Sequence, residues 1–68
     1  MKLYFNDNFD TNTLIANVDS EEKALSEINK YLKKHKYVSS YMRTWTGKRG
    51  KQWFDFGSHT EFFVLDKN

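Results

Sequence analysis

Apolar residues recur at spacings of three and four in the first half of the chain, which indicates one amphipathic helix. The apolar stripe consists of Ala24, Leu25, Ile28, Tyr31 and Leu32. Asp19 and Ser20 precede the stripe, and Asp19 with Glu22 forms a capping-box pattern typical of a helix start. Lysines crowd the other end, where cations stabilise the helix dipole. The sequence therefore predicts a helix over residues 20–35.

Five runs rich in β-branched and aromatic residues surround this helix, and turn-forming residues separate them. The expected strands cover residues 2–6, 13–18, 37–45, 51–56 and 60–65. Asn6, Asp7 and Asn8 favour a turn between the first two runs, and glycines lie in the turns at 46–50 and 57–59. The order β-β-α-β-β-β predicts an α+β fold, in which an antiparallel β-sheet carries one helix on one face.

The size of the chain limits it to one small domain. Its 68 residues are fewer than a typical domain contains, so we expect residues 1–68 to fold as a single unit around a small core. Cysteine is absent, which excludes disulfides and thiolate zinc sites as a source of stability. Aromatic residues make up 18% of the chain. Aromatic packing is therefore the expected source of stability, and self-association is the alternative.

The lengths of the last two turns decide which aromatic side chains lie under the helix, because side chains alternate between the faces of a sheet. With the turns given above, Trp45 lies opposite Lys51, and Trp53 lies opposite both Arg43 and Phe63. The face expected to pack against the helix contains Val38, Met42, Phe54, Phe56, Phe62 and Val64. The opposite, uncovered face contains Tyr41, Arg43, Trp45, Lys51, Trp53 and Phe63.

An uncovered face of this composition is typical of a binding surface, since Trp, Tyr and Arg dominate binding hot spots and exposed apolar patches mark interaction sites. Exposed cross-strand aromatic pairs also stabilise small sheets, by roughly 0.2–1 kcal/mol each, which is the alternative interpretation. Shifting one hairpin by a residue would place Trp53 with Met42 and Thr44, and Phe54 with Tyr41. We expect the uncovered face to dock a partner protein or a second copy of the chain as a homodimer.

Charge is distributed unevenly along the chain, whose net charge is +2. Residues 1–29 carry two Lys and six acidic residues, residues 30–51 carry eight cations and no acidic residue, and residues 52–68 carry one Lys and three acidic residues. Basic residues interleaved with aromatic ones are also typical of nucleic-acid binders, although neither an RRM aromatic pair nor a GXXG loop is present. Solvated surface is the simpler explanation of these cations. The residues of this alternative site are Lys33, Lys34, Lys36, Arg43, Lys48, Arg49 and Lys51.

The residue types that catalysis or metal binding requires are sparse. His35 and His59 are the two histidines, and no carboxylate cluster lies beside them at ligand spacing. We therefore expect no enzymatic activity, no cofactor and no metal. The N-terminal apolar run of five residues is shorter than a signal peptide requires, and no stretch of about 20 apolar residues exists. We expect a cytoplasmic protein without membrane contact.

The stretch RTWTGKRGKQWFDFGSHTEFF at residues 43–63, and WFDFGSHTEFF within it, resembles small proteins encoded by phages and prophages of Gram-positive bacteria. The Lys-, Asn-, Phe- and Tyr-rich composition agrees with an AT-rich genome. This resemblance implies an accessory phage protein that binds a host protein and inhibits or redirects it, for example in a defence system such as CRISPR. It assigns no functional residue.

Overall fold

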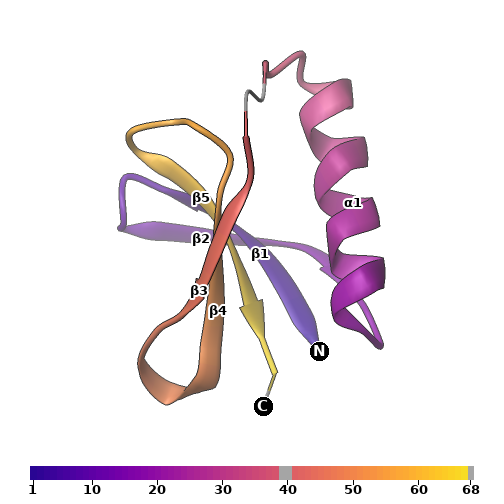
Figure 1. Cartoon of the computed structure of the whole chain (residues 1–68), viewed down its shortest axis with the longest axis vertical. Coiled ribbons are helices and arrows are strands. Elements are labelled where there is room, and N and C mark those ends of the chain that lie inside the picture. Colours follow the sequence, from indigo (N-terminus) through magenta and orange to yellow (C-terminus); the bar gives the residue numbers. More distant parts are fainter. Residues whose placement is uncertain (39–40, 68) are drawn as a thin grey trace.

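The computed structural model describes residues 1–38 and 41–67. In chain order its elements are β1 (Lys2–Asp7), β2 (Thr11–Asn17), α1 (Glu21–Lys34), β3 (Arg43–Thr46), a short 3-10 turn (Lys48–Gly50), β4 (Lys51–Asp55) and β5 (Glu61–Asp66). The strands form one antiparallel sheet in the spatial order β2-β1-β5-β4-β3. The helix lies beside this sheet and packs on one of its faces (Figure 1). The predicted α+β class is confirmed.

Ser20 caps the N-terminus of helix α1. Ser20 has an extended backbone, and its Oγ accepts a hydrogen bond from the Lys23 N–H at 3.1 Å. The cap therefore lies one residue later than the pattern starting at Asp19 indicated. Acidic residues fill the first turn, while Lys33 and Lys34 lie in the last turn and favour the dipole there. The observed bounds confirm the predicted helix.

We expect the Ser20→Ala variant to lose about 1 kcal/mol of stability, because the Lys23 N–H then has no side-chain acceptor. The measurement is urea denaturation followed by circular dichroism. Ser26→Ala is the matched control, since Ser26 lies on an exposed face of the helix interior. Equal denaturation midpoints for the two variants would show that the Ser20 cap contributes nothing.

The helix ends in a left-handed turn that sends the chain back toward the sheet. The Tyr37 N–H donates to the Leu32 carbonyl at 2.9 Å and the Lys36 N–H to the Lys33 carbonyl at 3.3 Å, which is the pattern of a Schellman motif. Lys36 has a φ of 58° in this turn. The Tyr37 hydroxyl then donates to the Glu61 carboxylate at 2.7 Å, and this bond raises the pKa of Tyr37 to about 12.

The hydrophobic core lies between α1 and the sheet. Three aromatic rings form its centre: Phe63 lies 5.4 Å from Phe5 and 5.4 Å from Phe56, between ring centroids. Tyr31 stacks on Phe5 at 4.9 Å and connects the helix to β1. Aromatic packing thus supplies much of the buried surface, as expected. The buried core residues are Leu3, Phe5, Val18, Ala24, Ile28, Leu32, Phe54, Phe56, Phe63 and Leu65.

The strand expected over residues 37–45 is shorter than predicted, since β3 covers Arg43–Thr46. Residues 39 and 40 of the expected strand lie outside the described residues. Val38 was expected in the core, and this is wrong because 92% of its surface is exposed. The turn after α1 directs Tyr37 toward the core, so its neighbour Val38 points away.

The β3–β4 hairpin has a tighter turn than predicted. The Gly47 N–H donates to the Lys51 carbonyl at 2.7 Å and encloses a three-residue turn, Lys48–Gly50, with two left-handed residues. Trp45 consequently lies opposite Trp53 and not opposite Lys51. The register differs from the predicted one by two residues. Because side chains alternate with a period of two, Trp45 and Trp53 still share a face, as predicted.

The β4–β5 register differs from the predicted one by a single residue, which exchanges the two faces of β5. Phe54 lies opposite Phe63, and both pack under α1. Phe63 was expected on the uncovered face; this is wrong, since its side chain is fully buried in the core. Phe62 and Val64 were expected under the helix, and this is also wrong because they lie on the opposite face.

Hydrogen bonds within the β4–β5 connection explain the shift. Asp55 Oδ1 accepts the Gly57 N–H at 2.9 Å, and Gly57 has a φ of 103°, which glycine adopts readily. Ser58 Oγ then accepts the N–H groups of Thr60 at 3.4 Å and Glu61 at 3.1 Å. These bonds lengthen the turn, so β5 begins at Glu61, one residue later than expected.

Candidate partner-binding face

The sheet surface opposite α1, called the open face below, carries a row of apolar and aromatic side chains. Leu3, Phe54 and Leu65 belong to the core under the helix, so their neighbours along each strand point to the open face. Direct strand partners bring one such residue from each strand into a line across the sheet. The row is Leu14, Tyr4, Val64, Trp53 and Trp45.

Four rings at one end of this row form what we call the aromatic cluster: Phe9, Trp45, Trp53 and Phe62. The Phe62 centroid lies 4.8 Å from Phe9, 5.8 Å from Trp53 and 6.2 Å from Trp45. The two indoles are parallel to within 6° at 6.4 Å. Gly47 leaves room for Trp53, because a Cβ there would lie 3.0 Å from its Nε1. Phe62 is buried, while Phe9 and Trp45 are 65% and 42% exposed.

Phe9 reaches the cluster from the β1–β2 turn. Hydrogen bonds of the Asn6 side chain and of the Asn8 backbone hold this turn in place. Asn6 is buried; its Oδ1 accepts the Phe9 N–H at 3.1 Å, and its Nδ2 donates to Asn12 Oδ1 at 2.8 Å. The Asn8 N–H donates to the Thr60 carbonyl at 2.7 Å. Phe9 itself has a φ of 59°, which is uncommon for a bulky residue. The turn thus holds an exposed phenyl ring in a strained backbone conformation.

An ion pair between an exposed Arg43 and a buried Asp55 lies at the edge of the cluster. Arg43 Nη2 donates to Asp55 Oδ2 at 2.8 Å, and the Asp55 side chain is nearly inaccessible to solvent. The Arg43 guanidinium also lies 5.6 Å from the centroid of the Tyr41 ring. The hydrogen bond from Arg43, followed by that from the Gly57 N–H, holds the pKa of Asp55 below its ordinary value. The same bond to Asp55 raises the pKa of Arg43.

The structure brings most of the expected docking residues together. Arg43, Trp45, Lys51 and Trp53 share the open face, with Lys51 opposite Asp66 of β5. Tyr41 precedes β3 and lies beside Arg43. Phe63 belongs to the core and is therefore not one of the docking residues. Phe9 and Phe62 were missed: the first is a single aromatic residue within a polar turn, and the second was assigned to the wrong face.

The basic residues of the alternative site do not form one surface. Lys33, Lys34 and Lys36 lie at the C-terminal end of α1, while Lys48 and Arg49 lie in the β3–β4 turn. These two segments are at opposite ends of the long axis of the molecule (Figure 1). Arg43 and Lys51 lie on the open face. The cations that adjoin the aromatic cluster are thus those of β3, β4 and the turn between them.

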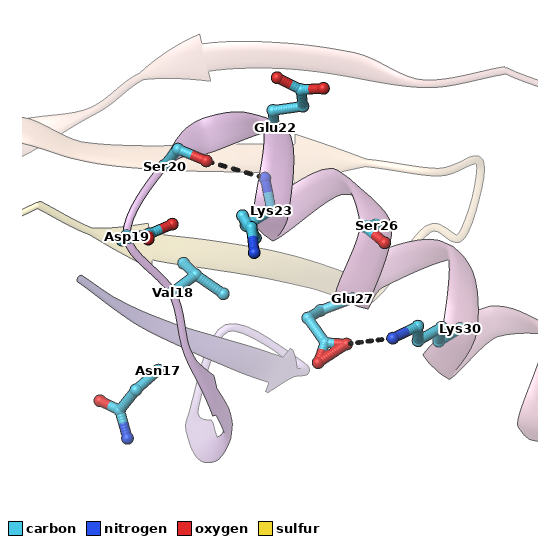
Figure 2. Close-up of a pocket in the computed structure, with 9 residues that line it drawn as sticks. All are labelled: Asn17, Val18, Asp19, Ser20, Glu22, Lys23, Ser26, Glu27 and Lys30. Atoms are coloured by element: carbon cyan, nitrogen blue, oxygen red, sulfur yellow. Dashed lines mark hydrogen bonds and ion pairs between the residues drawn. The ribbon is translucent and has the colours of Figure 1, made fainter.

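A second surface feature is a polar hollow between residues 17–20 and the outer side of α1 (Figure 2). Three of its side chains interact within the helix itself: Ser20 Oγ accepts the Lys23 N–H, and Glu27 pairs with Lys30 at 3.6 Å. Among residues 1–38 and 41–67, no group of three or more His, Asp or Glu side chains is arranged to hold a metal ion. The open face is therefore the stronger candidate site.

Among the described residues, no helix is long and apolar enough to cross a membrane. Comparison of the chain with protein-family models, with curated proteins and with solved structures gave no match. The candidate site is therefore defined by its geometry: an aromatic cluster with two exposed rings, bordered by Arg43, Tyr41 and Lys51 on the open face.

Proposed function

We propose that this protein is a small interaction module that docks a partner protein on the aromatic cluster. The observation that carries the proposal is the arrangement of Phe9 and Trp45, which are exposed while the Phe62 ring beneath them is buried. Exposed rings on a rigid base lose little conformational entropy on binding, and aromatic residues dominate interface hot spots. Arg43 is held beside them by Asp55 and adds a cation at the margin.

The partner we propose is a host protein, and the chain acts by covering part of that protein's surface in the host cytoplasm. This part of the proposal depends on the resemblance of residues 43–63 to accessory phage proteins, which would inhibit or redirect a host enzyme or a defence complex such as CRISPR. Binding and not catalysis is the proposed activity, because the conspicuous surface chemistry is aromatic and basic.

A second candidate function is binding of single-stranded nucleic acid. It is favoured by one observation: the exposed Trp45 ring adjoins the basic β3–β4 hairpin, which carries Arg43, Lys48, Arg49 and Lys51. Bases stack on exposed aromatic rings and cations neutralise phosphates. Such binding weakens steeply as salt rises, because neutralised phosphates release counterions. The separation of the lysines of α1 from this hairpin makes the candidate weaker than the first.

The test is capture of host protein by the tagged chain from a lysate of a Gram-positive bacterium, with nuclease-treated and untreated samples compared. We expect the double variant Phe9→Ala, Trp45→Ala to reduce capture of a discrete protein by about tenfold or more, because hot-spot rings are removed. Val38→Ala is the matched control, since it shortens an exposed apolar side chain outside the cluster. Arg43 and Trp53 are less suitable positions, because Arg43 also pairs with the buried Asp55 and Trp53 is itself partly buried.

Three results would contradict the docking proposal. Equal capture by the double variant and by Val38→Ala would show that the cluster does not bind the partner. Capture that disappears after nuclease treatment would move the function to nucleic acid. A wild-type dimer in analytical ultracentrifugation that the double variant converts to monomer, without any captured protein, would assign the cluster to self-association.

A further inference from the structure

We infer that the free edge of β3 accepts an extended acidic segment of a partner protein as an additional strand of the sheet. The inference rests on the proposed docking function and names the class of partner. β3 is the last strand in the order β2-β1-β5-β4-β3, so β4 pairs with one of its edges, and within residues 1–38 and 41–67 no strand pairs with the other. All four of its residues are exposed. An unpaired edge of this kind is a template for strand addition.

The ladder shows which backbone groups are available at this edge. The Gly47 N–H bonds the Lys51 carbonyl, and the β3–β4 register runs without interruption from this pair. Hydrogen-bonded pairs recur at every second residue of an antiparallel ladder, so Trp45 and Arg43 direct their backbone groups toward β4. Thr44 and Thr46 consequently direct their N–H and carbonyl groups outward, where an added strand would bond them.

The other edge of the sheet is less suited to this role. β2 is paired with β1 through an irregular register: Tyr4 lies opposite Leu14, but Leu3 lies opposite Ala16, so Ile15 is an extra residue. Such a bulge twists an edge and interrupts further pairing, which is one of the devices that protect edges. The β3–β4 register has no such shift. Of the two edges, β3 is the one built for regular addition.

Charge decides what kind of segment fits. Arg43, Lys48, Arg49 and Lys51 lie on β3, on the adjoining turn and at the start of β4, and no acidic residue lies between residues 30 and 51. Pairing of two copies of the chain at this edge would bring these cations together, which disfavours a homodimer here. A segment with Asp or Glu is electrostatically complementary to the same edge.

The two faces of β3 favour different residue types on the two faces of an added strand. On the open face an added strand would meet Arg43 and the Trp45 ring, which is 42% exposed. On the helix face it would meet Thr44 and Thr46, with Glu21 close by, since Gln52 Nε2 donates both to Glu21 at 2.9 Å and to Thr44 Oγ1 at 2.7 Å. The fitting segment thus places acidic and aromatic residues at alternate positions facing the open side, and uncharged residues between them.

A designed peptide tests this inference without knowledge of the natural partner. The probe is a blocked seven-residue peptide, Thr-Glu-Thr-Trp-Thr-Glu-Thr, titrated into the isotope-labelled full chain while amide chemical shifts are recorded by NMR. The largest shifts are expected at the Thr44 and Thr46 amides. A peptide with Lys in place of Glu is expected to bind at least about tenfold more weakly, because it repels the basic hairpin.

Two substitutions at one position isolate the edge from the aromatic cluster. Thr46→Pro removes an N–H that points outward, and an edge strand tolerates proline at such a position. The substitution is expected to weaken binding of the probe peptide by about tenfold. Thr46→Val keeps the N–H and is the matched control, expected to bind the probe as the wild type does. Thermal unfolding of both variants checks that the sheet is retained.

The outcomes separate the two proposals. Equal binding by Thr46→Pro and Thr46→Val, with loss in Trp45→Ala, would overturn the edge inference and leave the docking cluster intact. No shift at millimolar probe, or equal binding of the Lys peptide, would overturn the edge inference alone, since the lysate capture tests the cluster. Stronger binding of an oligothymidine than of the probe in the same titration would replace the acidic segment with nucleic acid and overturn the edge inference, while the lysate capture still decides the docking proposal.

Discussion

The Phe63→Ala variant is expected to be mostly unfolded at 25 °C. Phe63 is fully buried, and its ring contacts Phe5, Tyr31 and Phe56 at the centre of the core. Removing such a ring leaves a cavity and costs about 3–5 kcal/mol. Domains of this size have only about 3–5 kcal/mol of stability in total. Circular dichroism and urea denaturation measure the loss.

Two further variants make this prediction specific to position 63. Phe63→Leu retains most of the apolar volume and is expected to remain folded with a lowered denaturation midpoint. Phe9→Ala removes the same side chain from an exposed position and is expected to change stability by less than about 1 kcal/mol. A folded Phe63→Ala variant with normal stability that had lost its partner would restore Phe63 to the docking face and contradict the observed β4–β5 register.

The second large effect concerns Asp55 and acid stability. Its side chain is buried, and the bonds from Arg43 and Gly57 hold its pKa below the ordinary value of 3.8. A carboxylate with a lowered pKa stabilises the folded state fully above its unfolded pKa, and this contribution is lost as pH falls through the folded pKa. The stability of the wild type should therefore decrease below about pH 4. Asp55→Ala is expected to cost about 1–3 kcal/mol at neutral pH, because bonds to a charged group are lost.

The pH dependence itself distinguishes an electrostatic contribution from simple packing. Asp55→Asn keeps the shape and an acceptor for the Gly57 N–H but cannot ionise. We expect its unfolding free energy, measured by urea denaturation at several pH values, to fall less on acidification than that of the wild type. Acid sensitivity as steep in Asp55→Asn as in the wild type would show that another carboxylate causes it.

The helix and the number of strands followed from the sequence because their patterns are local. The apolar stripe of α1 repeats with the helical period, and polar or glycine-containing turns separate the strands. The exact pairing of β4 with β5 depends instead on hydrogen bonds inside one turn. Ser58 and Asp55 lengthen that turn, and no periodicity along the chain records this. One residue of difference was enough to exchange Phe62 with Phe63.

The run Phe62–Leu65 gave no help in choosing between the registers, because all four of its residues are buried. β5 is the middle strand of the sheet, with the core on one side and the aromatic cluster on the other. Continuous apolar sequence is what a strand covered on both faces requires. The continuous apolar run of β5 therefore indicates that side chains on the open face cover Phe62. The rings of Phe9, Trp45 and Trp53 provide this cover.

The spatial order of the strands also sets when the molecule can fold. β1 lies between β2 and β5, and Lys2 is the direct partner of Asp66. During synthesis on a ribosome, the β1–β2 hairpin and α1 emerge early, yet Leu3 and Phe5 lack their strand partners Leu65 and Phe63 until β5 has been translated. Pairing β1 with β5 closes a loop that spans most of the chain, and this is slow compared with forming a hairpin between strands adjacent in sequence. The nascent chain must therefore complete its core after translation of its last strand, and chaperones have access to its apolar surface until then.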